Sequence, residues 1–276
     1  MEDRKILMYA HAGSGNHGCE AIVRSVCQIL GNEKEKNITL LSNDVAEDRR
    51  YGLDSVCRLV QERKIEQHFL THAWYYAQRR LTGNGENFLR YRYADAQPFG
   101  DYSTAVSIGG DNYCYDIMID DLEKAHRMFH RQGLRTVLLG CSIEPEIIEK
   151  RQDIRADMKL YDRIIARESI TFGALTAAGL TNAVLCPDPA FALKMQETEL
   201  PDGFRLYADG GTAGINVSPM VQECGGDGHS GIVMHSYEKM IEYILGNTGM
   251  DIALIPHVIW DRNDDRKPLS ILYDKY

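Results

Sequence analysis

A glycine-rich segment near the start of the chain has the composition of an anion-binding turn. It follows the apolar residues 6–10 and precedes a stretch whose apolar side chains recur at helical spacing. Such a turn presents backbone N–H groups at a helix N-terminus, where the helix dipole favours a phosphate or a carboxylate. These glycines do not form the lysine-containing phosphate-binding loop, because no lysine follows Gly18. A ligand cradle and a structural tight turn are therefore both open for Gly13, Ser14, Gly15, Asn16, His17 and Gly18.

The end of another apolar stretch, residues 105–108, carries a second group of candidate ligand-binding residues. This stretch runs into Gly109, Gly110, Asp111 and Asn112. Glycines there let a ligand approach the backbone, and open α/β sheets bind ligands at the carboxyl ends of their strands. Asp111 and Asn112 either bond such a ligand or cap the following helix.

An arginine and a pair of histidines are suited to charge neutralisation and proton transfer. Arg167 lies between a predicted strand, 163–166, and a predicted helix for which Ser169 is the expected N-cap. A guanidinium in that place suits a carboxylate or a phosphate, and it equally suits an ion pair with a neighbouring acid. His17 and His257 lie at strand ends and titrate in the range needed for proton transfer, while a structural role stays open for each.

Strands and helices alternate along the chain, which predicts an α/β fold with parallel sheets. A first domain is predicted over residues 1–195, a linker over 196–212 and a second domain over 213–276. The strands predicted in the first domain are 6–10, 38–41, 105–108, 134–139, 163–166 and 183–186.

The second domain has strands predicted at 213–217 and 251–255 and a helix at 235–245. The apolar face of that helix is formed by Tyr237, Met240, Ile241, Ile244 and Leu245. Because this set of elements does not cover both faces of a parallel sheet, either the second domain packs wholly on the first or the chain is a fragment whose later strands are missing. The fragment is favoured, so the second domain is predicted to be incomplete.

Residues 45–100 are polar and include a cationic, aromatic section that runs from Trp74 to Tyr93. Aromatic rings interleaved with arginines can stack on a sugar or a base. The acidity of the whole chain favours the alternative, a partly solvated helix pair whose aromatic side chains turn inward.

Composition narrows the class of protein. The net charge of −9 over 276 residues argues against nucleic acid or an anionic membrane as the main partner. The seven cysteines form no C-x-x-C pair, which favours free thiols in a reducing cytoplasm over a metal site. No window approaches the roughly 20 apolar residues of a membrane span.

The order of short motifs resembles the polysaccharide pyruvyl transferase family. Taken singly each motif is weak, but together they cover most of the chain in the right order. The motifs are residues 13–22 (GSGNHGCEAI), 108–111 (IGGD), 140–145 (GCSIEP), 167–169 (RES), 187–191 (PDPAF), 215–219 (INVSP) and 255–257 (IPH).

The resemblance implies two Rossmann-like domains that face each other across a cleft, as in the glycosyltransferase B fold. It also implies transfer of the enolpyruvyl carbons of phosphoenolpyruvate onto a sugar or a lipid-linked saccharide, as a pyruvate ketal. Such a reaction needs a general acid and donors for a carboxylate and a phosphate, and it needs neither a redox cofactor nor an obligate metal.

On this reading His257 and Arg167 are the catalytic candidates. The candidates for donor binding are Gly13, Ser14, Gly15, Asn16, His17, Gly18, Gly109, Gly110, Asp111, Asn112, Ser142 and Asn216. Members of the family typically carry an Arg-x-His sequence in the C-terminal half of the second domain. This chain departs from that pattern, because no Arg-x-His sequence occurs between Gly211 and Tyr276. That departure puts the activity of this chain in doubt.

Alternative functions remain open from the sequence. One is a glycosyltransferase with a nucleotide-sugar donor and the same two-domain shape. Another is a sugar- or anion-binding protein without catalytic activity. The sequence does not specify the acceptor sugar, the ketal stereochemistry or the oligomeric state.

Overall fold

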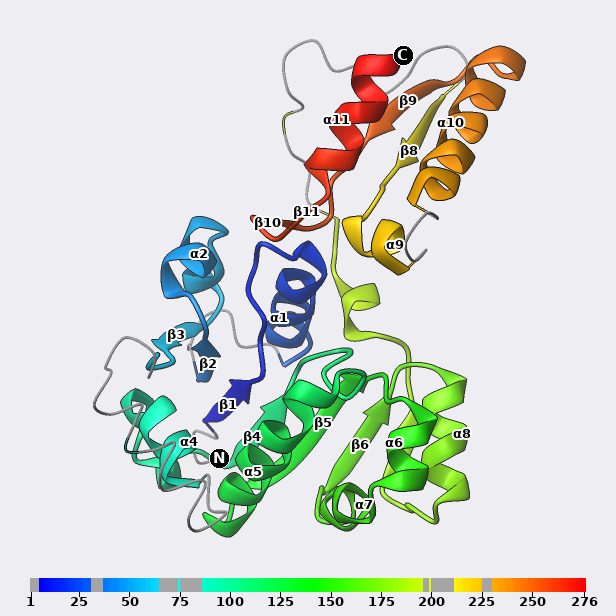
Figure 1. Ribbon diagram of the computed structural model, residues 1–276. Helices are drawn as coiled ribbons and strands as arrows, with labels where there is room; N and C mark the ends of the chain where they lie inside the picture. Colours follow the sequence, from blue (N-terminus) through cyan, green and yellow to red (C-terminus); the bar gives the residue numbers. More distant parts are fainter. Residues whose placement is uncertain are drawn as a thin grey trace. The chain divides into compact units, whose positions relative to one another are not determined.

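The chain folds into two compact units (Figure 1). The computed structural model describes residues 5–30, 37–64, 74, 86–195, 199, 211–224 and 230–276. The first unit contains residues 1–14 and 18–193, and the second contains residues 15–17 and 194–276. Most of the predicted linker, 196–212, lies outside the described residues, as does the glycine-rich stretch 225–229.

The first unit is built on a seven-stranded parallel sheet with the order β3-β2-β1-β4-β5-β6-β7. This confirms the predicted α/β fold class. The strands are β1 (Ile6–Tyr9), β2 (Ile38–Ser42), β3 (Arg58–Gln61), β4 (Thr104–Ser107), β5 (Arg135–Cys141), β6 (Arg163–Ala166) and β7 (Ala183–Leu185).

Helices cover both faces of this sheet. Alternate residues of each strand point to opposite faces, so both faces carry apolar side chains that must be buried. Met8 of β1 packs with Val23 on one face, while Leu7 and Tyr9 pack with Phe129 on the other. The α-helices of the unit are α1 (His17–Ile29), α2 (Val45–Arg50), α4 (Glu86–Arg92), α5 (Asp116–Arg131), α6 (Pro145–Lys150), α7 (Gln152–Met158) and α8 (Ser169–Ala177). Short 3-10 turns are η1 (Leu53–Ser55), η3 (Ala94–Ala96), η4 (Phe99–Asp101) and η5 (Pro189–Ala192).

The predicted helix pair, between Trp74 and Tyr93, lies mostly outside the described residues and stays a prediction. Residues 45–100 hold several described elements. They contribute an edge strand, β3, that the polar composition concealed, and a short helix, α4. Tyr93 is buried and stacks on Phe129 at 5.9 Å between ring centroids, as expected of an inward aromatic, whereas Trp74 is 69% exposed. Tyr75, Tyr76, Arg79 and Arg80 lie outside the described residues.

The cap of α8 is also different from the prediction. Ser169 is the first residue of the helix, and Glu168 is the N-cap instead. The Glu168 carboxylate accepts hydrogen bonds from the backbone N–H groups of Ile170 and Thr171. A longer carboxylate thus takes the role expected of the serine hydroxyl.

The second unit contains a parallel pair of strands, β8 (Thr212–Ile215) and β9 (Asp251–Leu254). Around it lie α9 (Pro219–Cys224), α10 (Ser230–Asn247), the antiparallel pair β10 (Ile259–Trp260) and β11 (Asn263–Asp264), and α11 (Arg266–Lys275).

Helix α11, which the periodicity did not reveal, supplies much of the core of the second unit. Its Leu269 and Leu272 pack with Ile241 of α10 and with Ile215. The predicted apolar face of α10 is partly wrong, because Met240 and Leu245 are 41% and 49% exposed.

Candidate functional site

Arg167 directly follows β6, at the carboxyl end of that strand, and its guanidinium is fixed by neighbouring polar groups. Its Nε donates to Ser142 Oγ at 2.8 Å, and its Nη1 donates to Asp188 Oδ2 at 3.0 Å. The structure therefore shows the ion pair with a neighbouring acid that the sequence left open. It also brings Ser142, which follows β5, to the same edge of the sheet.

Gly110 lies directly beneath the guanidinium of Arg167. A methyl group at Gly110 would come within 2.4 Å of Arg167 Nη1, so a side chain there would displace the arginine. The Gly110 carbonyl accepts a hydrogen bond from the Ser142 N–H. Gly110, Ser142 and Arg167 are thus brought together by the ends of β4, β5 and β6, the edge at which parallel sheets bind ligands.

The residues beside Gly110 tie this loop to the end of β1. Asn112 Nδ2 donates to the Ala10 carbonyl at 3.0 Å, and its side chain fills the space that a methyl group at Gly109 would occupy. Asp111 accepts a hydrogen bond from the Tyr115 hydroxyl at 3.0 Å. Neither side chain caps α5, whose N-cap, Tyr115, makes no side-chain cap bond.

The thiol of Cys19, in the first turn of α1, belongs to the same electrostatic environment. The pKa of Cys19 is raised to about 11, chiefly by burial and also by the negative charge of Asp111, while the positive charge of Arg167 acts to lower it. The thiol is therefore protonated at neutral pH. Cys19 belongs to the motif at residues 13–22, but it was not among the predicted site residues, because a single cysteine indicates no particular chemistry.

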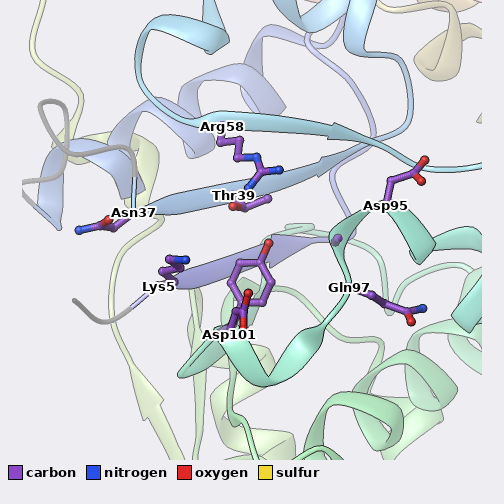
Figure 2. A pocket seen from close by; sticks show the side chains of 9 residues that line it. Lys5, Asn37, Thr39, Arg58, Asp95, Gln97 and Asp101 are labelled. Atoms are coloured by element: carbon purple, nitrogen blue, oxygen red, sulfur yellow. The ribbon is translucent and has the colours of Figure 1, made fainter. Parts of the chain in front are cut away.

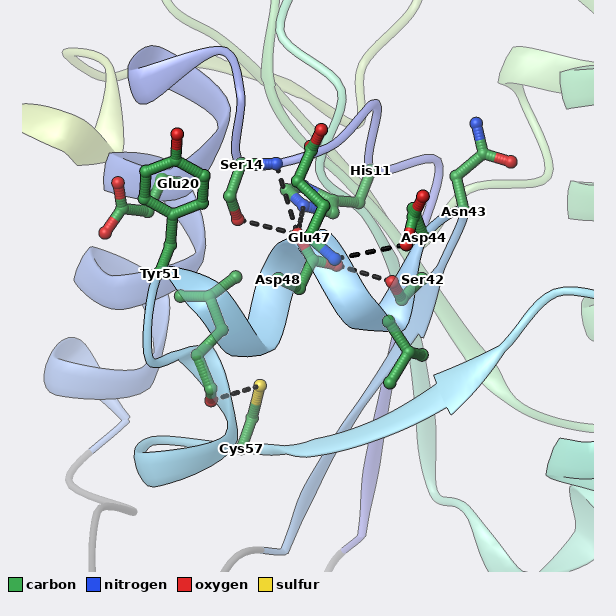
Figure 3. A network of polar contacts seen from close by, with 12 residues as sticks. His11, Ser14, Glu20, Ser42, Asn43, Asp44, Glu47, Asp48, Tyr51 and Cys57 are labelled. Atoms are coloured by element: carbon green, nitrogen blue, oxygen red, sulfur yellow. Dashed lines mark hydrogen bonds and ion pairs between the residues drawn. The ribbon is translucent and has the colours of Figure 1, made fainter.

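The first half of the glycine-rich turn is held by the buried carboxylate of Asp48 (Figure 3). Asp48 Oδ1 accepts from the Ser14 N–H at 3.1 Å and from the Ser14 hydroxyl at 2.6 Å, and it lies 3.1 Å from His11 Nε2. Its other oxygen accepts from the Ser42 hydroxyl. This network fixes the conformation of residues 11–14 against α2.

The second half of the turn pairs with the backbone of the second unit. Asn16 forms an antiparallel bridge with Val258. The His17 N–H donates to the His257 carbonyl at 3.1 Å, and the Ile259 N–H donates to the Gly15 carbonyl at 2.9 Å. Gly13, Ser14 and Gly18 remain with the first unit.

These contacts limit what the turn offers to a ligand. The N–H groups of Ser14 and His17 already donate to Asp48 and to His257, so they are not open donors in this conformation. The role of the turn in donor binding stays a prediction.

In the second unit, His257 lies beside His17 and close to Asn216. The His257 side chain is exposed, and its ring lies 6.5 Å from that of His17 in an edge-to-face arrangement. Asn216 Nδ2 donates to the Ile255 carbonyl at 3.0 Å and to Asp265 Oδ2 at 2.8 Å. His17, Asn216 and His257 therefore form one cluster, arranged around Asp265.

A cavity of about 90 Å³ lies at the opposite edge of the large sheet (Figure 2). It is lined at the amino ends of strands by Lys5, Asn37, Arg58 and Asp101. None of the predicted site residues lines it. Its charges are of both signs, so it does not select an anion.

Sequence reasoning missed the carboxylates that support the candidate residues, Asp48, Asp188 and Asp265. Asp188 had a signal, because it lies between Pro187 and Pro189 in a rigid turn. Asp48 and Asp265 had none, because no sequence pattern links them to Ser14 and to Asn216, which lie 34 and 49 residues away.

The described residues hold neither a metal cluster nor a membrane-spanning helix. They contain no group of three or more histidine, cysteine or acidic side chains arranged to hold a metal ion. Over the same part of the chain, no helix has both the length and the apolarity needed to cross a bilayer.

A doubly covered parallel sheet with polar groups at its carboxyl edge defines a ligand-binding α/β protein. The family model described as polysaccharide pyruvyl transferase matches residues 16–274, and the chain belongs to this family of transferases. The resemblance seen in the ordered motifs is thereby confirmed.

Among solved structures, the chain is similar to the apo form of the lipopolysaccharide outer core galactosyltransferase WaaB. The TM-score is 0.40 at 10% identity, over 91% of this chain and 60% of that one. No curated protein matches the chain.

Replacing Asp48 by alanine should destabilise the first unit. The substitution leaves the buried donors of Ser14 and Ser42 unpaired, which costs about 3–5 kcal/mol in the free energy of unfolding. Urea denaturation at pH 7 measures the loss. The exposed carboxylate of Glu149 provides the control, since Glu149→Ala should change this free energy by no more than about 0.5 kcal/mol. Equal effects of the two variants would show that the Asp48 carboxylate does not stabilise the first unit through these hydrogen bonds.

The Asp48 network should also make stability depend on pH. Burial alone would raise the pKa of Asp48, but its bonds to His11, Ser14 and Ser42 and the charge of His11 outweigh burial and lower it. A lowered folded-state pKa contributes stability above the ordinary value of 3.8, and this stability is lost as pH falls through the folded-state value.

The measurement compares the free energy of unfolding of wild type and Asp48→Asn from pH 7 to pH 3. The difference between the two proteins should be largest at pH 7 and should shrink below about pH 4, because the protonated aspartic acid then resembles asparagine. A difference that is independent of pH would show that the carboxylate charge plays no part.

Proposed function

We propose that the protein transfers the pyruvyl group of phosphoenolpyruvate to a sugar as a ketal. Family membership supports a transferase that modifies polysaccharides. The observation that carries the finer proposal is the Arg167 guanidinium, held over Gly110 at the carboxyl edge of the sheet by Ser142 and Asp188. An oriented guanidinium at that edge suits the carboxylate or the phosphate of the donor.

The reaction balances without an oxidant or a reductant. A general acid protonates the methylene carbon of the enol, and two sugar hydroxyls add to the neighbouring carbon. The bond between that carbon and the phosphate oxygen breaks, and phosphate leaves with the bonding electrons. The two hydroxyl protons are released, one replacing the proton donated by the acid, so the products are a ketal and inorganic phosphate.

Arg167 binds the donor anion in this proposal by exchanging one partner for another. Its Nη1 bonds Asp188, and its side chain is 29% exposed, so an anion can reach the guanidinium. Among the described residues, Nη2 makes no hydrogen bond. A substrate oxygen at Nη2, or in place of Asp188, would gain a charge-assisted hydrogen bond.

His257 is the proposed general acid. Its ring is exposed, while its backbone is held on both sides, by the His17 N–H at its carbonyl and by Asp265 at its own N–H. An imidazole suits this task because its ordinary pKa lies near neutral pH. The exposed ring is free to meet a substrate without disturbing the backbone bonds.

The acceptor is proposed to be a free or lipid-linked saccharide, and the site of action the cytoplasm. The cysteines whose side chains are described, Cys19, Cys27, Cys57, Cys114, Cys141 and Cys186, are all free thiols. Free thiols are typical of a reducing compartment. Phosphoenolpyruvate is the only small-molecule co-substrate that the balanced reaction requires, with no further cofactor.

Replacing Arg167 should weaken donor binding. Loss of the guanidinium in Arg167→Ala should raise the KM for phosphoenolpyruvate by about 10- to 100-fold, the equivalent of one charged hydrogen bond or two. The measurement is phosphate release from phosphoenolpyruvate with a panel of sugars, alongside the thermal shift caused by phosphoenolpyruvate alone.

Arg163→Ala is the matched control, because Arg163 is the first residue of β6 and lies at its other end. This variant should behave as wild type. If phosphoenolpyruvate fails to stabilise wild type while nucleotide sugars do so, the proposed donor is wrong. If both variants keep the wild-type KM, Arg167 is not the donor-binding residue.

A further inference from the structure

A fully buried carboxylate, Asp265, lies behind the loop that carries His257. Asp265 has 0% of its surface exposed to solvent. Its Oδ2 accepts hydrogen bonds from the His257 N–H at 2.8 Å, from the Val258 N–H at 2.9 Å and from Asn216 Nδ2 at 2.8 Å. One oxygen atom thus fixes two consecutive peptide groups of the loop and a side chain that follows β8.

The backbone of Asp265 closes the same loop a second time. Its N–H donates to the Val258 carbonyl at 2.9 Å, and its carbonyl accepts from the Leu269 N–H in the first turn of α11. Between these bonds the chain reverses through the β10–β11 pair. Residues 257–258 are therefore tied to the start of a helix through both the side chain and the main chain of one residue.

The loop at residues 257–259 is hydrogen-bonded in turn to the glycine-rich segment at residues 15–17. The His257 carbonyl accepts from the His17 N–H at 3.1 Å, and the neighbouring Ile259 N–H donates to Gly15. Asp265 thus sets the backbone on which both histidine rings stand. No other acidic side chain among the described residues bonds the N–H groups of residues 257 and 258.

Stability alone is a poor reason for this arrangement. Asp265 Oδ1 is buried and has no hydrogen-bond partner within the described part of the chain. A buried carboxylate with one unpaired oxygen stabilises a fold less than a well-packed apolar side chain of similar volume. The bonds of the other oxygen all converge on the His257 loop and on Asn216.

We infer that Asp265 is the positioning residue for His257. It fixes the backbone from which the exposed imidazole projects, and it does not itself touch the reacting atoms. This inference rests on the proposed function, in which His257 donates the proton.

The test compares Asp265→Ala and Asp265→Asn with the control Asp264→Asn. Asp264 is the adjacent residue, and its carboxylate bonds Arg266. Asp265→Asn keeps the volume and an acceptor oxygen, so it provides a folded variant if the alanine variant does not fold. Thermal melting verifies folding of each protein before the measurements.

Hydrogen–deuterium exchange reports the geometry independently of catalysis. Peptides that cover residues 14–20 and 254–262 should exchange about tenfold faster or more in Asp265→Ala, because the N–H groups of His257, Val258 and His17 lose their restraint. Asp265→Asn should be intermediate and Asp264→Asn should equal wild type. Wild-type protection in Asp265→Ala would overturn the inference.

Kinetics tests whether the effect acts through His257. Asp265→Ala should lower the kcat of phosphate release by about 10- to 100-fold with the KM for phosphoenolpyruvate unchanged, the cost of a misplaced catalytic group. The double variant His257→Asn/Asp265→Ala should lose no more activity than His257→Asn alone. Additive losses, or an unchanged kcat in Asp265→Ala, would overturn the inference.

The exchange and kinetic measurements together separate this inference from the proposed function. If wild type releases no phosphate from phosphoenolpyruvate with any acceptor, the proposed function fails. The exchange measurement still decides whether Asp265 restrains the loop, and unchanged protection would then reject the positioning role as well.

Discussion

A carboxylate removed from water must be matched by hydrogen-bond donors, and this requirement shapes one loop in each of the two units. In the first unit, Asp48 gathers Ser14, His11 and Ser42 around one buried side chain. In the second, Asp265 gathers Asn216 and the backbone of residues 257–258. The conformation of each loop therefore follows from a charge placed behind it rather than from the loop's own residues.

The same constraint changes how the glycine-rich turn is understood. A glycine turn at a helix N-terminus predicts open N–H donors, yet those of Ser14 and His17 are already occupied. Its glycines serve a turn that is held by partners on either side. Arg167, which lies over Gly110 and is oriented by Ser142 and Asp188, is the residue that we propose to bind an anion.

The fold was predictable where the signal is local. Apolar runs predicted the strands from β1 to β9 except for β3, and the strand ends predicted that Gly110 and Arg167 share one edge of the sheet. Strand β3, with the sequence Arg-Leu-Val-Gln, carries too little apolar character to stand out at the sheet edge, and α11 is polar overall and contains a proline in its first turn. The supporting carboxylates were not predictable, since Ser14 and Asp48 are 34 residues apart and Asn216 and Asp265 are 49 apart. Only the folded chain brings such pairs together.

Phosphoenolpyruvate is the proposed donor of the carbon unit that this member of the family attaches to a sugar. The most direct measurement follows phosphoenolpyruvate labelled with ¹³C at its second carbon by NMR, in the presence of the enzyme and candidate saccharides. If the protein transfers the pyruvyl group, the enol signal disappears and the signal of a quaternary ketal carbon appears as phosphate is released. Free pyruvate as the sole labelled product, or consumption of a nucleotide sugar while phosphoenolpyruvate stays intact, would contradict this proposal.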